Sequence, residues 1–190
     1  GVSLGVLVAI LYTVIGGFVT VAWTDFFQGM LLLLAVLAVP VVAFFDVGGT
    51  SAIMSAGSLK NISLNLAPHK STWLTTIFLF LAMGPGYFGQ PHILTKFMGI
   101  NNPNNMYKSK YLGVSWQILA LFGAVCVGMI SWAYFQGQTI NPELVFVLMT
   151  KSLFHPFIAG LILCGIFAAT TSTLESQILV VASLASEDVY

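Results

Sequence analysis

Five long apolar stretches alternate with short polar segments along the chain. A helix needs about 20 residues at 1.5 Å each to cross the hydrocarbon core of a bilayer. The apolar stretches cover residues 2–22, 26–45, 73–97, 112–135 and 157–184. None of them alternates between apolar and polar residues with period two, as membrane β-strands do. The pattern therefore predicts an all-α integral membrane protein with five transmembrane helices.

The composition supports this interpretation and excludes several classes of protein. Of the 190 residues, 58% are hydrophobic and only 6% are charged, against roughly 25% charged residues in a soluble domain. The formal net charge is zero, which leaves no basic stripe to bind nucleic acid. Cys126 and Cys164 lie inside apolar runs and indicate no disulfide framework. We expect the lipid bilayer as a partner and no nucleic acid.

The distribution of lysine predicts how the protein is oriented in the cell membrane. Three lysines flank or lie in the loop over residues 98–110, close to two helix ends: Lys96, Lys108 and Lys110. The other three are scattered over longer loops on the opposite side: Lys60, Lys70 and Lys151. Lysine near helix ends marks the cytoplasmic side, so we place the 98–110 loop in the cytoplasm. Each span crosses the membrane once, and the turn at 23–25 and the C-terminal end are each two spans away from this loop. They are therefore predicted to be cytoplasmic too.

The third apolar stretch carries three glycines and two prolines between Gly84 and Pro91. Proline removes a backbone donor, and glycine costs a helix about 1 kcal/mol relative to alanine, so we expect the helix to unwind here. Unwound backbone in a membrane is tolerated only where protein or water satisfies it, and secondary transporters bind substrate at such breaks. Tyr87, Gln90 and His92 lie in or beside this segment. The alternatives are a plain proline kink, a helix-packing hydrogen bond for Gln90 and a satisfied histidine at a helix end for His92.

Small and hydroxyl-bearing residues share one face of the fifth apolar stretch. At 100° per residue these positions cover less than a third of the helix circumference: Gly165, Ala169, Ser172, Thr173 and Ser176. Such a face allows close helix packing. It also offers the oxygen ligands that a hard cation prefers. The sequence leaves both interpretations open.

Two acidic residues lie in or near apolar stretches. Ionisable residues inside membrane spans are costly and mark functional sites. Asp25 follows the first stretch, where it either lies in an ion pathway or forms the N-cap of the next helix. Glu175 adjoins the hydroxyl-bearing face of the fifth stretch, where it serves either a binding site or a helix end at the interface. Between the fourth and fifth stretches, Asn141 and Pro142 predict the start of a short helix that runs to about Lys151.

Four motifs, taken together and in order, resemble those of the sodium:solute symporter family, and most closely its sodium/proline symporter branch. They lie at residues 12–17 with 23–28, at 86–93, at 141–143, and at 168–177 with 187–190. The resemblance covers nearly the whole chain. It implies a leucine-transporter-like core of five plus five helices in inverted repeats, of which residues 1–190 form one transmembrane fragment.

The resemblance also implies roles for individual residues. A sodium ion would be held by the Ala169 carbonyl, Ser172 and Thr173. A second group would form another cation site or the sodium exit path: Asp25, Glu175 and Ser176. The substrate-binding positions would be Met83, Tyr87, Gln90 and Pro91. The branch usually has Trp at position 83, so Met83 puts the identity of the solute in question.

Taken together, these observations predict that the protein is a sodium-coupled symporter for a small zwitterionic solute, such as the amino acid proline, and that it is not an enzyme. Two alternatives stay open. One is a proton-coupled carrier in which Asp25 or Glu175 titrates. The other is a membrane sensor domain that uses the same fold without transport.

Overall fold

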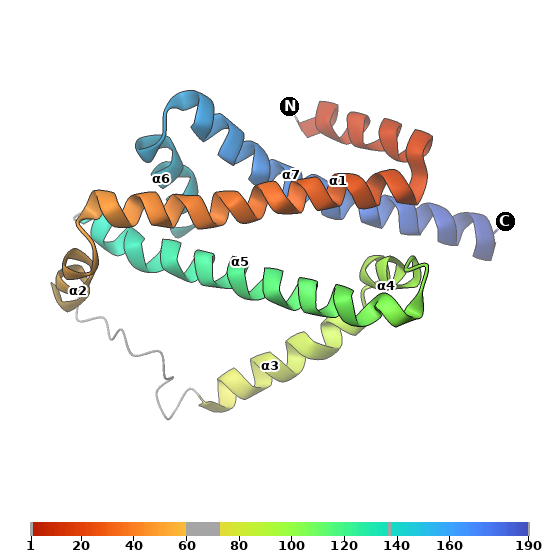
Figure 1. Ribbon diagram of the computed structural model, residues 1–190, viewed down its shortest axis with the longest axis horizontal. Coiled ribbons are helices and arrows are strands. Elements are labelled where there is room, and N and C mark those ends of the chain that lie inside the picture. The colour runs from red at the N-terminus through yellow and green to blue at the C-terminus, as the bar shows by residue number, and fades with distance from the viewer. Residues whose placement is uncertain (1, 60–72, 137, 190) are drawn as a thin grey trace. The chain divides into compact units, whose positions relative to one another are not determined.

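The computed structural model describes residues 2–59, 73–136 and 138–189, and the regular elements of these residues are helical. In chain order the α-helices are α1 (Val2–Val47), α2 (Thr50–Leu59), α3 (Trp73–Phe88), α4 (Pro91–Met98), α5 (Met106–Tyr134), α6 (Val145–Leu153) and α7 (Pro156–Leu184) (Figure 1). Two short 3₁₀ helices, η2 (Pro103–Asn105) and η3 (Pro142–Leu144), precede α5 and α6, and a π-helical turn, η4 (Ala185–Val189), follows α7. The prediction of an all-helical chain is confirmed.

Three helical segments of the described chain are long and apolar enough to cross a membrane. They are Gly5–Val47, Pro103–Tyr134 and Pro156–Glu187. The apolar helix at Trp73–Gly86 is shorter, because a break ends α3 before it reaches the length that a bilayer needs. The division into five spans therefore remains a prediction, while three membrane-length helices are present.

The first two apolar stretches form one element, α1, with a single break at Gly17. This residue has φ 58° and ψ −154°, a conformation that is essentially restricted to glycine. The ribbon turns sharply in the N-terminal part of α1 (Figure 1). The sequence analysis places the junction of the two spans at 23–25, and that boundary stays a prediction. Trp23, Thr24 and Asp25 keep helical geometry, because nothing in their side chains prevents it, whereas Gly17 can adopt the strained backbone.

The break in the third stretch is narrower than the sequence suggested. Helix α3 continues through Gly84 and Pro85 to Phe88, and only Gly89 and Gln90 separate it from α4. Gln90 has extended geometry, with φ −99° and ψ 104°, as the residue before a proline prefers. Pro91 follows it at the first position of α4. The break is thus set by Pro91 and not by the Gly84–Gly86 segment.

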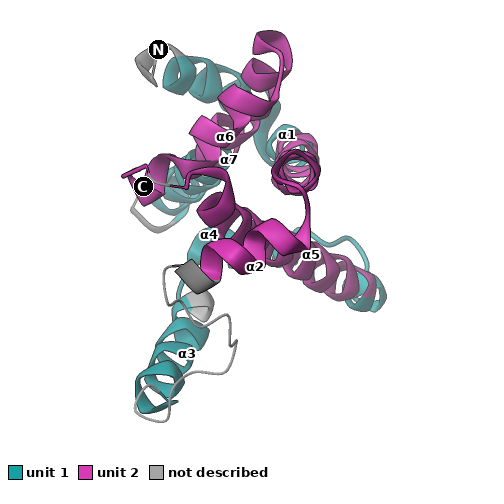
Figure 2. Cartoon of the chain, turned by 90° about the vertical axis from the view of Figure 1, so that its left-hand side faces the viewer, with its two compact units in different colours: residues 1–23, 64–107, 171–190 teal, residues 24–63, 108–170 magenta. Residues whose placement is uncertain are grey.

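The chain divides into two compact units (Figure 2). Unit 1 contains residues 1–23, 64–107 and 171–190, and unit 2 contains residues 24–63 and 108–170. Unit 2 holds the main hydrophobic core, which α1, α5, α6 and α7 build together. Its buried members are Ala35, Val39, Ala43, Val127, Ile130, Met149 and Ile162. Three of these recur every four residues along α1, the spacing of one helix face.

Unit 1 brings parts of α1, α4 and α7 together. Their side chains line a common cavity of about 250 Å³, to which Phe18, Thr95, Gly99 and Val180 contribute. A Cβ atom on Gly99 would lie 2.4 Å from the ring of Phe18, so the end of α4 lies directly against α1. The buried positions of this unit include Ala9, Thr13, Val21, Glu175, Ser176 and Val180.

Candidate functional site

The hydroxyl-bearing face of α7 is continuous in the structure, because the helix runs without a break from Pro156 to Leu184. Gly165 is buried, and a Cβ atom there would be 3.5 Å from Leu31 Cδ2 in α1. Close helix packing therefore explains this end of the face. Ala169 and Ser172 are half-buried, and Thr173 is exposed. One helix thus supplies the three predicted sodium ligands, and their joint role in binding an ion stays a prediction.

Two adjacent polar residues of α7 are almost completely buried. Glu175 is 0% exposed and Ser176 is 3% exposed. Most of the helix is exposed, and only 17% of its most apolar 18-residue stretch is buried. Its few buried positions would be expected to be apolar, since burying a carboxylate is costly unless it is well satisfied. The sequence analysis left open that Glu175 lies at a helix end at the membrane interface. That alternative is wrong, because the side chain lies in the protein interior.

Asp25 lies in the interior of α1, half-buried and eight positions after the Gly17 break. The alternative role as an N-cap is therefore wrong, because an N-cap residue begins a helix. Gln28 follows three residues later, on the same side of the helix. Its Oε1 atom is buried and accepts no hydrogen bond from any described residue. Buried carbonyl oxygens without a donor are rare, so Gln28 joins Asp25 as a candidate polar site in unit 2.

The predicted substrate-binding residues cluster around the α3–α4 break. Met83 is exposed on α3, Gln90 is the N-cap of α4, and Pro91 follows it, also exposed. The Gln90 carbonyl accepts hydrogen bonds from the backbone of Ile93 and Leu94, at 3.1 and 3.4 Å. The side chain of Tyr87 lies outside the described residues. The role of these positions in binding a solute stays a prediction.

Thr13 is a buried polar residue that the sequence did not single out. It is 6% exposed, and its Oγ1 atom has no hydrogen-bond partner among the described residues. It belongs to unit 1, as do Glu175 and Ser176. The sequence signal is a threonine within an apolar run, which is common in membrane helices, where such hydroxyls usually bond to their own backbone.

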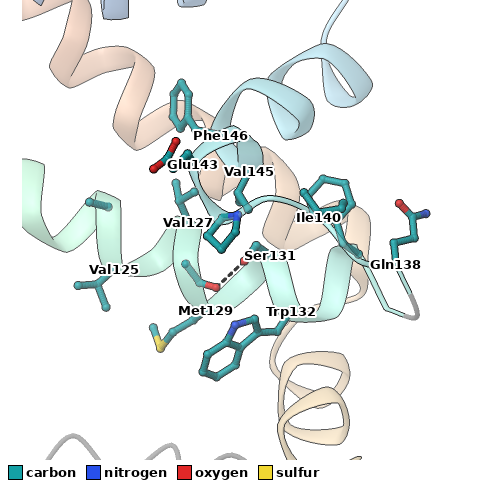
Figure 3. Close-up of a pocket in the computed structure, with 14 residues that line it drawn as sticks. Val125, Val127, Met129, Ser131, Trp132, Gln138, Ile140, Glu143, Val145 and Phe146 are labelled. Atoms are coloured by element: carbon teal, nitrogen blue, oxygen red, sulfur yellow. Dashed lines mark hydrogen bonds between the residues drawn. The ribbon is translucent and has the colours of Figure 1, made fainter. Parts of the chain in front are cut away.

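A cavity of about 650 Å³ lies in unit 2 between the end of α5 and the start of α6, and we call it the α5–α6 cavity (Figure 3). Figure 3 shows Met129 and Trp132 on one side of it and Glu143 and Phe146 on the other. Ser131, between them, donates a hydrogen bond of 2.6 Å to the Gly128 carbonyl. Among the described residues that line it, Glu143 is the only one with an ionisable side chain.

A second and larger cavity, of about 820 Å³, adjoins the first through Phe135, Gln138 and Ile140, which line both. We call it the Asp46–Lys151 cavity, because these two residues, from the ends of α1 and α6, give it one charge of each sign. The sequence contained a signal for it. The sequence analysis predicts that both residues lie at helix ends on the same side of the membrane, but their separation in the sequence gave no reason to pair them.

The start of η3, the 3₁₀ helix that leads into α6, agrees with the sequence analysis. Asn141 precedes Pro142, and its Oδ1 atom accepts a hydrogen bond of 3.1 Å from the Glu143 amide. The predicted cap is therefore confirmed. The helix ends at Leu153 instead of about Lys151, a difference of the size expected at helix ends.

Comparisons with known proteins agree with the resemblance seen in the motifs. The model of the family described as "Sodium:solute symporter family" matches residues 1–190. The chain is 39% identical to sodium/proline symporter 2 of Staphylococcus saprophyticus and 40% identical to a sodium/proline symporter of Staphylococcus aureus. It is also 40% identical to the osmoregulated proline transporter OpuE of Bacillus subtilis.

Each of these alignments covers the whole of this chain. The chain spans 37% of the length of the two staphylococcal relatives and 39% of the length of the Bacillus relative. No solved structure matches the chain.

Proposed function

The chain belongs to the sodium:solute symporter family, a family of transporters and not of enzymes, and from this premise we propose that it takes part in sodium-coupled solute transport. The solute is a small zwitterion, most simply the amino acid proline, and sodium is the co-transported substrate. The names of the relatives, which include sodium/proline symporters and a proline transporter, support this choice. The mechanism is alternating access, in which the coupling depends on different affinities in the outward and inward states.

The observation that carries this proposal is the burial of Glu175 and Ser176 in α7. In a lipid-facing helix, polar oxygen atoms in the protein interior carry a cost that only function or a specific interaction offsets. They lie on the same helix as Ala169, Ser172 and Thr173. A membrane-spanning helix that presents hydroxyl, carbonyl and carboxylate oxygens within two turns suits a hard monovalent cation, which prefers oxygen ligands.

We assign two cation sites along this region. The first consists of the Ala169 carbonyl and the hydroxyls of Ser172 and Thr173. The second, or an exit path toward the cytoplasm, involves Asp25, Glu175 and Ser176. The interior position of Asp25 in α1 supports this role, since the capping alternative no longer accounts for its charge.

The solute binds at the α3–α4 break. The break exposes backbone polar groups around Gln90, and the extended geometry there is fixed by Pro91. Met83 provides apolar surface two turns earlier in α3, and we include Tyr87, whose side chain lies outside the described residues, because an aromatic residue suits a compact ring. The wider architecture is the leucine-transporter-like bundle with five spans in this segment, placed with the 98–110 loop and the C-terminal end in the cytoplasm.

Reconstituted full-length protein tests the proposal. Proteoliposomes loaded with potassium buffer are diluted into sodium buffer, and uptake of radiolabelled proline is followed. A parallel experiment imposes an inward proton gradient without sodium. We expect accumulation with the sodium gradient and only equilibration with the proton gradient. Accumulation driven by protons alone would replace sodium coupling with proton coupling.

The buried carboxyl group of Glu175 is the specific observation that favours the proton-coupled alternative. The variant Glu175→Gln separates the two mechanisms, because it keeps the size and hydrogen-bonding capacity of the side chain but cannot titrate. If protons are the coupling ion, this variant loses proton-driven accumulation. If sodium is the coupling ion, the variant still accumulates proline, with an altered sodium requirement.

A further inference from the structure

A close contact within unit 1 joins the end of helix α4 to helix α1. A Cβ atom on Gly99 would lie 2.5 Å from Cε1 of Phe18 and 3.5 Å from its Cε2, so the edge of the half-buried Phe18 ring lies on the Gly99 backbone. Glycine allows this approach because it has no side chain to fill the space. The proposed cation and solute sites include neither residue, so the contact calls for an explanation of its own.

Phe18 directly follows the break in α1 at Gly17, whose φ is 58° and ψ −154°. A Cβ atom on Gly16 would lie 2.9 Å from Cγ2 of Thr20, so the chain folds closely over itself across the break. Glycine populates positive and negative φ with similar ease, and residues that absorb changes in φ and ψ serve as hinges. Rotation at Gly17 moves Phe18 relative to the first part of α1, and we call Gly16 and Gly17 the α1 hinge.

The cavity of about 250 Å³ in unit 1 lies beside the Phe18 ring, which forms part of its wall. A cavity of about 150 Å³ is enough to hold a benzene molecule, so this one has room for the ring. The rest of the wall is apolar or carries small hydroxyls: Thr95, Met98, Leu179, Val180 and Ser183. Because side chains occupy discrete rotamers, the ring has two places, one on Gly99 and one in the cavity.

Helix α4 depends on its two ends for its position, because none of its residues is buried. Its start, Pro91, adjoins the α3–α4 break. At its end, the Gly99 amide donates a hydrogen bond of 3.0 Å to the Thr95 carbonyl, which ties Gly99 to the last turn. The helix has 8 residues and spans about 12 Å at 1.5 Å per residue. Such a short helix moves as a unit, so a shift of Gly99 also shifts Gln90 at the other end.

We propose that Phe18 is a positioning residue whose ring, placed on Gly99, holds α4 against the α1 hinge and so fixes the geometry of the α3–α4 break. We call this contact the α4 latch. When the ring lies on Gly99, the break keeps the geometry of this structure. When the ring lies in the cavity, α4 is released and the backbone around Gln90 can move. The role of the latch in transport rests on the proposed function, which places the solute at this break, whereas the latch itself rests on the contact, the hinge and the cavity.

The latch lies at the end of α4 that leads into the 98–110 loop, which is the cytoplasmic side in the orientation we propose. A closed latch on this side favours the outward state, and its release favours the inward state. A ligand that binds one state shows an apparent affinity reduced by the fraction of protein in that state. Weakening the latch therefore raises the proline concentration for half-maximal uptake, whereas a misfolded fraction of the protein lowers the maximal rate alone.

Thiol labelling tests the latch without transport. The full-length protein, with its native cysteines replaced, carries Ser183→Cys in the cavity wall and reacts with a small maleimide in nanodiscs without sodium or proline. Gly99→Ala should drive the ring into the cavity and slow labelling by roughly tenfold, the scale of an overpacked contact. Adding Phe18→Ala to Gly99→Ala should restore the rate, because no ring remains to fill the cavity. Ala182→Cys, which is exposed and outside this cavity, is the matched reporter and should label alike in every variant.

Uptake of labelled proline measures the role of the latch in transport. Phe18→Ala should raise the half-maximal proline concentration by roughly tenfold, within the usual range of coupling between two sites, with little change in the maximal rate. The double variant with Gly99→Ala should match Phe18→Ala, because position 99 matters only while the ring is present. Two controls should transport as the wild type does: Val19→Ala changes an exposed neighbour, and Gly113→Ala adds a Cβ atom that meets nothing within 4 Å.

The latch is overturned if Gly99→Ala leaves the labelling rate unchanged, or if the double variant labels as slowly as Gly99→Ala alone. An unchanged half-maximal proline concentration in Phe18→Ala would overturn its positioning role. If Gly99→Ala does not fold and the double variant does, that rescue supports the latch, and if neither folds the latch is refuted. The expected labelling pattern in a protein that accumulates no proline would support the latch while the proposed function fails.

Discussion

Gly123 in α5 lies so close to Val36 in α1 that a Cβ atom on it would be 2.8 Å from Val36 Cγ1 and 2.9 Å from the Val36 carbonyl oxygen. The carbonyl belongs to the backbone and cannot move aside as a flexible side chain can. The absence of a side chain at position 123 is therefore what allows these two long helices to pack, in the manner of small residues at membrane helix interfaces.

Gly123→Ala is expected to destabilise the protein by about 1–3 kcal/mol, the usual cost of overpacking a tight contact. Gly128→Ala, one turn and a half further along the same helix, meets nothing within 4 Å and is the matched control. Alanine favours a helix over glycine by about 1 kcal/mol, so the control should be neutral or stabilising. Thermal unfolding in nanodiscs measures both, and equal stability of the two variants would contradict the contact.

Gly17→Ala is expected to destabilise the protein by about 1–3 kcal/mol, because its φ of 58° and ψ of −154° are strained for any residue with a Cβ atom. No atom lies within 4 Å of the missing Cβ position, so the effect comes from backbone strain alone. Gly29→Ala, in the same helix and equally open, is the control. The same unfolding assay applies, and a Gly17→Ala variant as stable as Gly29→Ala would mean that the chain does not turn at this residue.

Ser172→Ala and Thr173→Ala are each expected to raise the sodium concentration for half-maximal uptake by roughly tenfold or more, the effect of losing an interaction with a charged group. Thr170→Ala is the control, since the Thr170 hydroxyl donates to the Phe167 carbonyl at 2.7 Å and is exposed. Uptake of labelled proline over a sodium titration gives the result. Sodium curves that coincide with the wild type in both variants would refute the assignment.

Asp25→Asn is expected to preserve folding and to lower sodium-driven uptake at least tenfold, because an ion pathway needs the negative charge and the helix interior does not. Expression level and thermal stability serve as the measure of folding, and uptake in proteoliposomes as the measure of transport. Glu187→Gln removes an exposed acid beyond the end of α7 and should transport normally. Normal transport by Asp25→Asn would exclude Asp25 from the pathway.

Met83→Trp is expected to shift selectivity toward proline by roughly tenfold, since one packing group in a pocket is worth about 1–3 kcal/mol of discrimination. Ile77→Trp places the same side chain about 120° away around α3, at 100° per residue, and should leave selectivity unchanged. Competition of unlabelled amino acids against labelled proline measures the shift. If both variants behave alike, this face of α3 does not line the solute pocket.

The sequence by itself determined the class of the protein and its family. Long apolar runs with few charges can be stable only as membrane helices, and the ordered motifs from residue 12 to residue 190 identify the family. It also determined the cap at Asn141 and Pro142, because capping depends on the side chain and backbone of a few consecutive residues. These features are local, and local features can be read from sequence.

Only the tertiary structure decided which of two competing local signals prevails. Between residues 84 and 91 both prolines could have broken the helix, and the break follows Pro91, whose ring restricts Gln90, while α3 continues through Pro85. In α1 the break falls at Gly17 and not at the polar residues 23–25, which a helix tolerates.

Burial and pairing were also decided by tertiary structure. Glu175 could have lain at a membrane interface, and the packing of unit 1 buries it completely. Asp46 and Lys151 are more than a hundred residues apart in the chain, and only the packing of α1, α5 and α6 places them on one cavity. Such contacts depend on how helices pack against one another, which no local pattern of residues contains.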